Sequence, residues 1–136
     1  EFSLFDFALH QQSHSEKSVQ QILDEIRQEV AVVIPPAFNK FQNSFGHIFA
    51  GGYASGYYSY LWAEVLAADV FSRFEDEGIF NPATGAALWA QITGQGGSHD
   101  AMTLFTQFMG REPSVDALMR HKGLANSLGQ GQRHES

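Results

Sequence analysis

The side chains best suited to chemistry in this sequence lie close together, within residues 46–60. That segment contains one histidine, four glycines and all four tyrosines of the chain, whereas phenylalanine, which packs without a hydroxyl to satisfy, is used freely elsewhere. A tyrosine combines apolar area with a hydroxyl donor at its tip, and a glycine lets the backbone come close to a ligand. A flexible segment leading into a row of phenol donors indicates a site that grips a substrate carbonyl.

Helical spacing would bring three of these hydroxyls onto one face. Tyr53, Tyr57 and Tyr60 stand at positions i, i+4 and i+7, which share a face if the segment is an α-helix. Tyr58 would then point elsewhere, toward packing. The alternative interpretation is an aromatic stripe that only packs on a neighbouring helix, but phenylalanine would serve that purpose, so we favour a functional role.

His47 lies just before these tyrosines and is followed by the pair Gly51-Gly52. An imidazole has a pKa near physiological pH and can donate a hydrogen bond to an oxyanion. The alternative is a loop histidine that bonds to backbone. The neighbouring Gly-Gly-Tyr favours the functional interpretation.

Other polar residues give weaker signals. His10 and His14, at i and i+4, could bind a metal from one helix face, but the pattern places no third ligand, so no metal site is predicted in this chain. His134-Glu135 is followed by Ser136 alone, so no His-Glu-x-x-His motif is formed. Neither a nucleophile elbow nor a phosphate-binding loop is present.

Glu64 and Asp69 lie within an otherwise apolar segment, where an unpaired buried charge is costly. They could be acid–base groups, but pairing with an arginine or a capping bond is the favoured interpretation. Arg111-Glu112 and Arg120-His121 are interpreted as surface or inter-helix polar contacts.

The elements that must position these residues are helical nearly throughout, so the predicted fold class is all-α. Residues 37–52 are expected to be irregular, whereas the apolar residues between Leu61 and Phe74 surround their helix and predict burial on every side. Leu88, Trp89 and Ile92 are expected to face inward. A helix is expected over residues 2–12, with a strand as the alternative there. Further helices are expected from a cap at Ser15 or Ser18 to Pro35-Pro36, over 54–76 with a stop at Gly78, from Asn81-Pro82 onward, from a cap at Ser98, and from a cap at Ser114 to Gly123.

Composition limits the class of protein. At 136 residues the chain forms about one domain, which we place at residues 1–125, followed by a polar disordered tail at 126–136. The net charge of −7 disfavours nucleic acid, and no apolar run approaches the roughly 18 residues of a membrane span. The absence of cysteine fits a reducing compartment, so we expect a cytoplasmic location. Because the sequence starts at Glu1, we expect a piece trimmed or cut from something larger.

Several motifs resemble the C-terminal region of the thimet-oligopeptidase family of zinc metallopeptidases, over about residues 5–124. The longest covers residues 47–71 and reads His-Ile-Phe-Ala-Gly-Gly-Tyr-Ala-Ser-Gly-Tyr-Tyr-Ser-Tyr-Leu-Trp-Ala-Glu-Val-Leu-Ala-Ala-Asp-Val-Phe. Shorter ones are Gly-Ile-Phe-Asn-Pro-Ala-Thr-Gly at 78–85, Gly-Gly-Ser at 96–98, and Gly-Arg-Glu-Pro-Ser-Val-Asp-Ala-Leu at 110–118.

The resemblance implies a section of a large helical enzyme with a deep substrate channel. The family's zinc is held by a His-Glu-x-x-His helix and a downstream glutamate, and these zinc ligands are not in this chain. By resemblance, His47 and Tyr60 match positions that stabilise the transition state, and Tyr53 and Tyr57 match positions that contact substrate. The resemblance also implies that Gly51 and Gly52 belong to a loop that arches over the scissile peptide.

We therefore expect part of a zinc endopeptidase that acts on short peptides, with the chain alone inactive. Its other partners would be the remainder of its own polypeptide, or a second copy of the chain through an exposed apolar face. The alternative is a stand-alone helical module that binds peptides or other partners without catalysis.

Overall fold

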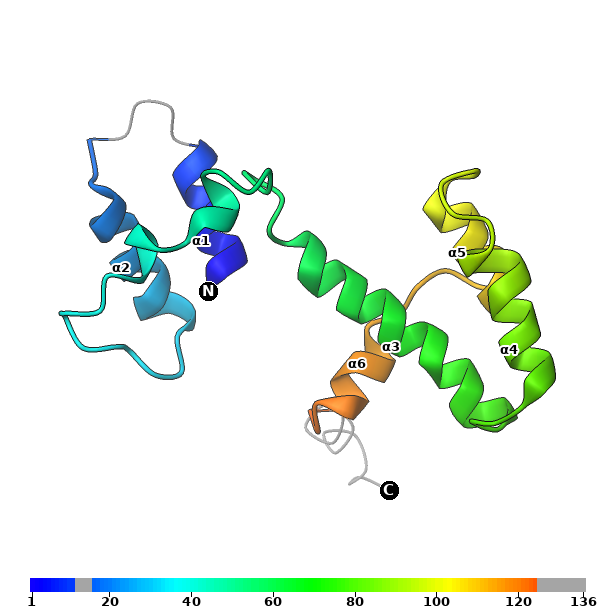
Figure 1. Ribbon diagram of the computed structural model, residues 1–136. Coiled ribbons are helices and arrows are strands. Elements are labelled where there is room, and N and C mark those ends of the chain that lie inside the picture. Colours follow the sequence, from blue (N-terminus) through cyan, green and yellow to red (C-terminus); the bar gives the residue numbers. More distant parts are fainter. Residues whose placement is uncertain (12–15, 125–136) are drawn as a thin grey trace, which may run out of the picture. The chain divides into compact units, whose positions relative to one another are not determined.

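A computed structural model describes residues 1–11 and 16–124 of the chain, and this part is helical without a strand, as predicted (Figure 1). It divides into two compact units, residues 1–60 and residues 61–136. The predictions for Ser15, His14 and the tail at 126–136 lie outside the described residues. The elements are α1 (Phe2–Gln11), α2 (Val19–Val30), η1 (Phe41–Asn43), η2 (Gly46–Ile48), α3 (Ser59–Glu77), α4 (Pro82–Leu88), η3 (Trp89–Thr93), α5 (Ala101–Met109) and α6 (Asp116–His121).

The first unit is built on α1 and α2, which pack against each other. Ser18 is the N-cap of α2: its hydroxyl accepts from the Gln21 amide, and its own amide donates to Gln21 Oε1. These two bonds form a capping box, so the predicted cap is confirmed. The helix ends at Val30, before the predicted stop at Pro35-Pro36. Two short 3-10 turns, η1 and η2, follow in the segment that was expected to be irregular. The core of this unit consists of Phe5, Ile22, Leu23, Phe45 and Ile48.

The second unit is built around α3. Its buried residues Val65 and Ala68 pack against Ala117 and Leu118 of α6, which Figure 1 shows beside α3. The predicted stop at Gly78 is confirmed, since this glycine has φ +105° directly after the helix. Asn81 caps α4 through a bond from the Ala83 amide, with Pro82 in the first turn, also as predicted.

Several predictions about the ends and faces of helices are wrong. The N-cap position of α6 is Val115, not Ser114, although the Ser114 hydroxyl accepts from the Asp116 amide. The central helix begins at Ser59 rather than at residue 54. Asp100, not Ser98, caps α5, because its carboxylate accepts from the amides of Met102 and Thr103. Trp89 is 69% exposed rather than inward-facing, and Leu88 and Ile92 are half-buried.

The expectation that α3 is buried on every side is also wrong. Leu61 is 55% exposed, Trp62 47% and Phe71 42%. The face that is covered is the one that meets α6. Leu61, Trp62 and Phe71 therefore leave part of the apolar surface of α3 exposed.

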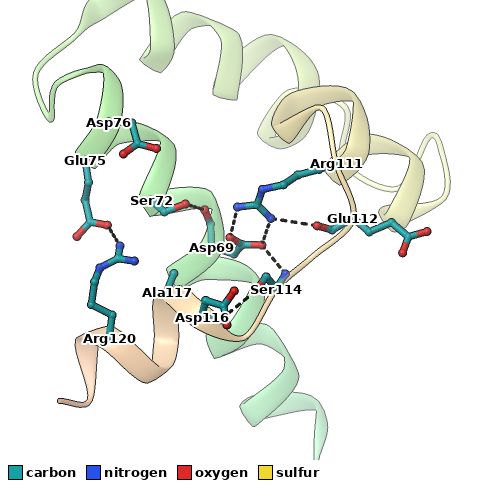
Figure 2. A pocket seen from close by; sticks show the side chains of 10 residues that line it. All are labelled: Asp69, Ser72, Glu75, Asp76, Arg111, Glu112, Ser114, Asp116, Ala117 and Arg120. Atoms are coloured by element: carbon teal, nitrogen blue, oxygen red, sulfur yellow. Dashed lines mark hydrogen bonds and ion pairs between the residues drawn. The ribbon is translucent and has the colours of Figure 1, made fainter. Parts of the chain in front are cut away.

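Asp69 joins α3 to the segment before α6. Its carboxylate, 1% exposed, accepts from Arg111 Nη1 at 2.8 Å and Nη2 at 2.5 Å, and from the Ser114 amide at 2.7 Å. Figure 2 shows the guanidinium directed at this carboxylate beside a cavity of about 590 Å³. The Arg111 contact is the largest cause that lowers the pKa of Asp69. The favoured interpretation of Asp69, pairing with an arginine, is therefore confirmed.

Other charged residues that the sequence singled out also form structural contacts. Glu64 is exposed and forms an ion pair with Lys122 at 2.6 Å. Arg120 and His121 of α6 both reach Glu75 of α3, which is the inter-helix contact that the sequence indicated.

Candidate functional site

His47 and three tyrosines form one aromatic cluster in the first unit. The His47 ring centroid lies 6.2 Å from that of Tyr53, 6.0 Å from that of Tyr57 and 6.4 Å from that of Tyr60. The Tyr60 ring is 5.3 Å from the Tyr53 ring and 5.1 Å from the Tyr57 ring. The structure therefore brings together all four aromatic side chains that the sequence singled out. We call these four residues the aromatic cluster.

The predicted reason for this proximity, a shared helix face, is wrong. Only Tyr60 lies on α3, while Tyr53 and Tyr57 lie in turns that precede the helix. In these turns the Gly56 amide donates to the Tyr53 carbonyl at 2.8 Å, and the Tyr60 amide donates to that of Tyr57 at 3.3 Å. Gly52, with φ +79°, and Ser55, with φ +54°, have left-handed backbone, which a right-handed helix cannot contain.

Gly51 and Gly52 shape the backbone next to His47. A Cβ at Gly51 would lie 2.9 Å from both the Cα and the carbonyl oxygen of His47, so only glycine fits this close approach. Gly52 is required by its positive φ. The same His47 carbonyl accepts from the Tyr53 amide at 3.1 Å. The two glycines thus bring Tyr53 back beside His47.

The aromatic cluster has an apolar base and an open side. Tyr57 is half-buried, and its ring lies 4.9 Å from that of the core residue Phe45, edge to face. Tyr53 is 37% exposed and Tyr60 48%. Tyr58 points away from the cluster, as expected, and stacks on Phe7 with ring centroids 5.3 Å apart.

The hydroxyl of Tyr60 interacts with that of Tyr53 rather than with the backbone. Among the described residues, no hydrogen bond ties a tyrosine hydroxyl to a backbone group. The hydrogen bond with Tyr53 is the largest cause that raises the pKa of Tyr60, followed by burial and by the charges of Tyr53 and Tyr57. A tyrosine with its ordinary pKa of about 10 is already protonated at neutral pH, and the upward shift keeps Tyr60 so. Tyr60 can therefore donate a hydrogen bond to a carbonyl or oxyanion.

Sequence reasoning missed Asp6, which supports this segment from α1. Its carboxylate is 1% exposed and accepts from the amides of Ser55, at 2.9 Å, and Tyr57, at 3.0 Å. A signal was present, since Asp6 is an acidic residue within an apolar helix, the pattern that singled out Asp69. The partners were not visible, because they lie 49 and 51 residues away.

Within residues 1–11 and 16–124, no group of three or more histidine or carboxylate side chains could hold a metal ion. His10 Nδ1 instead lies 2.8 Å from the Asp6 carbonyl oxygen and 2.9 Å from Asp6 Oδ1. His14 is outside the described residues. In the same part of the chain, no helix combines the length and apolar character that crossing a bilayer requires.

Comparison with known proteins identifies a family and several relatives of this sequence. The sequence model of peptidase family M3 matches residues 1–124. Oligopeptidase A of Haemophilus influenzae is 55% identical over 129 residues, covering 93% of this chain and 19% of that protein. Oligopeptidase A of Escherichia coli is 53% identical over 126 residues, covering 91% and 18%. Saccharolysin of Saccharomyces cerevisiae is 33% identical over 127 residues, covering 92% and 18%. The chain thus spans about a fifth of the length of these relatives, and the resemblance seen in its motifs is confirmed.

Proposed function

Because this chain belongs to peptidase family M3, we propose that it is part of a zinc-dependent oligopeptidase that hydrolyses short peptides. Its role in that enzyme is to supply hydrogen-bond donors to the substrate and to the transition state. The observation that carries the proposal is the aromatic cluster, in which the ring centroids of Tyr53, Tyr57 and Tyr60 lie within 6.4 Å of that of His47.

His47 and Tyr60 are the proposed catalytic groups. When water attacks a peptide carbonyl, negative charge develops on the carbonyl oxygen, and preorganised donors stabilise that charge. The phenol of Tyr60 is such a donor, because a tyrosine hydroxyl is protonated at neutral pH. By the precedent of other oxyanion sites, one donor contributes about 3–4 kcal/mol to the transition state. The imidazole of His47, exposed beside it, is the second donor.

Tyr53 and Tyr57 are the proposed substrate-binding groups. Their rings flank those of His47 and Tyr60, so a peptide that reaches the donors also meets apolar ring area with a hydroxyl at its edge. Gly51 and Gly52 contribute by keeping Tyr53 beside His47 and leave room for backbone to approach the substrate.

As the family resemblance implies, the zinc of such an enzyme would be held by residues outside this chain. The part of the chain that the structure describes contains no group of three or more ligand side chains for it. Bound zinc supplies an activated water and polarises the scissile carbonyl. The residues of this chain then act on the carbonyl oxygen, as described above. We expect the chain alone to be inactive, and the whole enzyme to reside in the cytoplasm.

The exposed apolar residues of α3, Leu61, Trp62 and Phe71, belong in this proposal to a surface that the remainder of the polypeptide covers. Exposed apolar area of this kind marks an interaction surface. In the isolated chain the same surface favours self-association, which light scattering at several concentrations would detect.

A quenched fluorescent peptide tests the proposed function. The full-length polypeptide that contains this chain should cleave it, lose activity to a chelator and regain it with added zinc, whereas the chain alone with zinc should not cleave. Chelator-sensitive cleavage by the chain alone would contradict the assignment of the zinc ligands to another part. Tight peptide binding by the full-length polypeptide without any cleavage would contradict the enzyme and favour a non-catalytic peptide-binding module.

A further inference from the structure

Asp6 makes a long-range contact with the segment that carries the tyrosines. Oδ1 accepts from the Ser55 amide at 2.9 Å, and Oδ2 accepts from the Tyr57 amide at 3.0 Å. The side chain is 1% exposed and leaves α1 toward a segment about fifty residues farther along the chain. Hydrogen bonds to an ionised acceptor are stronger than those between neutral groups. The carboxylate therefore fixes two of the three residues that lie between Ala54 and Tyr58.

Ser55 shows why such a contact is needed. It has φ +54° and is the one non-glycine residue with positive φ in the described part of the chain. A left-handed backbone is unfavourable for residues with a Cβ and persists where surrounding contacts hold it. The bond from the Ser55 amide to Asp6 is a contact of this kind. Asp6 thus stabilises a backbone conformation that serine at position 55 does not favour.

The turn at Ser55 sets where the rings of the aromatic cluster lie. The turn directs the Tyr57 ring toward its neighbours. Its centroid lies 6.0 Å from that of His47 and 5.1 Å from that of Tyr60. The amide of Tyr57, held by Asp6, is the backbone anchor of that ring. The other hydrogen bonds around Tyr53 and Gly56 join backbone groups of neighbouring turns. Asp6 supplies the side-chain hydrogen bonds from α1 to this segment, beside ring contacts from Phe2 to Tyr57 and from Phe7 to Tyr58.

We propose that Asp6 is a positioning residue for catalysis, which holds the Ser55–Tyr57 turn so that His47 and Tyr60 aim their donors at one substrate oxygen. The proposal rests on the proposed peptidase function, and it adds a role for a residue that does not touch substrate. A misplacement of donors by about 1 Å can reduce a rate about 100-fold. Loss of this anchor should accordingly lower kcat more than it raises KM.

The direct test compares Asp6→Asn with the wild-type sequence in the full-length polypeptide. Asparagine keeps the shape and one acceptor but replaces the other oxygen with a donor, so one of the two amide bonds is lost. We expect kcat for the quenched peptide to fall about 10- to 100-fold. Asp24→Asn is the matched control, since Asp24 is an exposed carboxylate on α2 that accepts from the Gln20 side chain, and it should leave kcat unchanged. A kcat for Asp6→Asn within twofold of wild type would overturn the proposal.

A second variant separates positioning from general stability. Glycine adopts positive φ without the penalty of a Cβ, so adding Ser55→Gly to Asp6→Asn should recover part of the lost kcat. A merely structural loss at α1 would not respond to a change at Ser55. No recovery in the double variant would therefore count against the positioning role.

Amide hydrogen exchange on the unmodified chain keeps the proposal testable if Asp6→Asn fails to fold. The amides of Ser55 and Tyr57 should exchange more slowly than that of Ala54, which donates no such bond among the described residues. Equal exchange at all three would overturn the proposal. This readout does not depend on activity, so a full-length polypeptide without peptidase activity would refute the proposed function but leave the Asp6 contact to be judged separately.

Discussion

Replacing Asp69 with asparagine should destabilise the second unit strongly at neutral pH. The substitution removes the charge that faces Arg111 and turns one acceptor oxygen into a donor. The lost contacts are short: 2.8 and 2.5 Å to the two guanidinium nitrogens and 2.7 Å to the Ser114 amide, around a carboxylate that is 1% exposed. They join α3 to the segment before α6, so their loss weakens the packing of these two helices.

The size of the effect follows from burial on the two sides of the pair. Removing one partner of a buried ion pair costs about 3–5 kcal/mol, mainly because the other charge is left buried. The Arg111 side chain is 45% exposed and can regain water, so we expect the lower end, about 3 kcal/mol. With a denaturant slope of about 1–3 kcal/mol/M in urea, the midpoint should fall by roughly 1–3 M.

The pH dependence of the free energy of unfolding tests the same ion pair independently. Arg111 lowers the pKa of Asp69 in the folded state below its ordinary value. The stabilisation is therefore complete above the pKa of the unfolded state, near 4, and is lost as pH falls through the lower folded pKa. The difference between wild type and Asp69→Asn should be largest at pH 7 and should shrink in the acid range.

Urea unfolding of the chain, followed by circular dichroism at several pH values, measures both quantities. Glu64→Gln is the matched control, because Glu64 lies on α3 like Asp69 but forms an exposed ion pair with Lys122. Exposed ion pairs contribute little to stability. A loss below 1 kcal/mol for Asp69→Asn at pH 7, or a loss that stays constant as pH falls, would refute the reasoning.

Three further predictions concern single side chains. Ser18→Ala removes the acceptor of the α2 capping box and should cost about 1 kcal/mol in urea unfolding; no change would show that the cap is dispensable. Gly51→Ala places a Cβ 2.9 Å from the His47 backbone and should lower hydrolysis by the full-length polypeptide, whereas Gly85→Ala, with no neighbouring atom within 4 Å, should not; equal activities would contradict the close approach. Trp62→Lys should reduce self-association of the isolated chain in light scattering, because the tryptophan is an exposed apolar group; unchanged association would place the contact elsewhere.

The parts of the fold that the sequence predicted correctly are those set by neighbouring residues. The cap at Ser18, the cap at Asn81 and the stop at Gly78 all depend on a few consecutive side chains and on backbone freedom. These signals are visible in any window of the chain. The same holds for the apolar periodicity that predicted an all-α fold.

The helix expected at the tyrosines was wrong because left-handed residues interrupt it, and one of them is bonded to a distant residue. The spacing of Tyr53, Tyr57 and Tyr60 fits a helix, but Ser55 takes a left-handed conformation that Asp6 stabilises from 49 residues away. No local pattern contains that contact. The four residues of the aromatic cluster were nevertheless identified, because residue type pointed to them independently of the helix.

The burial predicted for α3 was wrong for a different reason. An apolar sequence shows that a helix needs partners, but it does not name them. Within the second unit, α6 covers the face with Val65 and Ala68, and Leu61 and Trp62 stay exposed. The apolar pattern therefore predicted that α3 needs packing partners, but not whether this chain supplies them.

The most direct measurement of the central claim is the kcat of Tyr60→Phe in the full-length polypeptide with a quenched peptide substrate. The variant loses one hydroxyl and keeps the ring, and Tyr58→Phe makes the same change at a residue that stacks on Phe7 outside the aromatic cluster. If Tyr60 donates to the oxyanion, its kcat should fall about 100- to 1,000-fold with little change in KM, while Tyr58→Phe stays near wild type. Equal kcat values for the two variants would contradict the account.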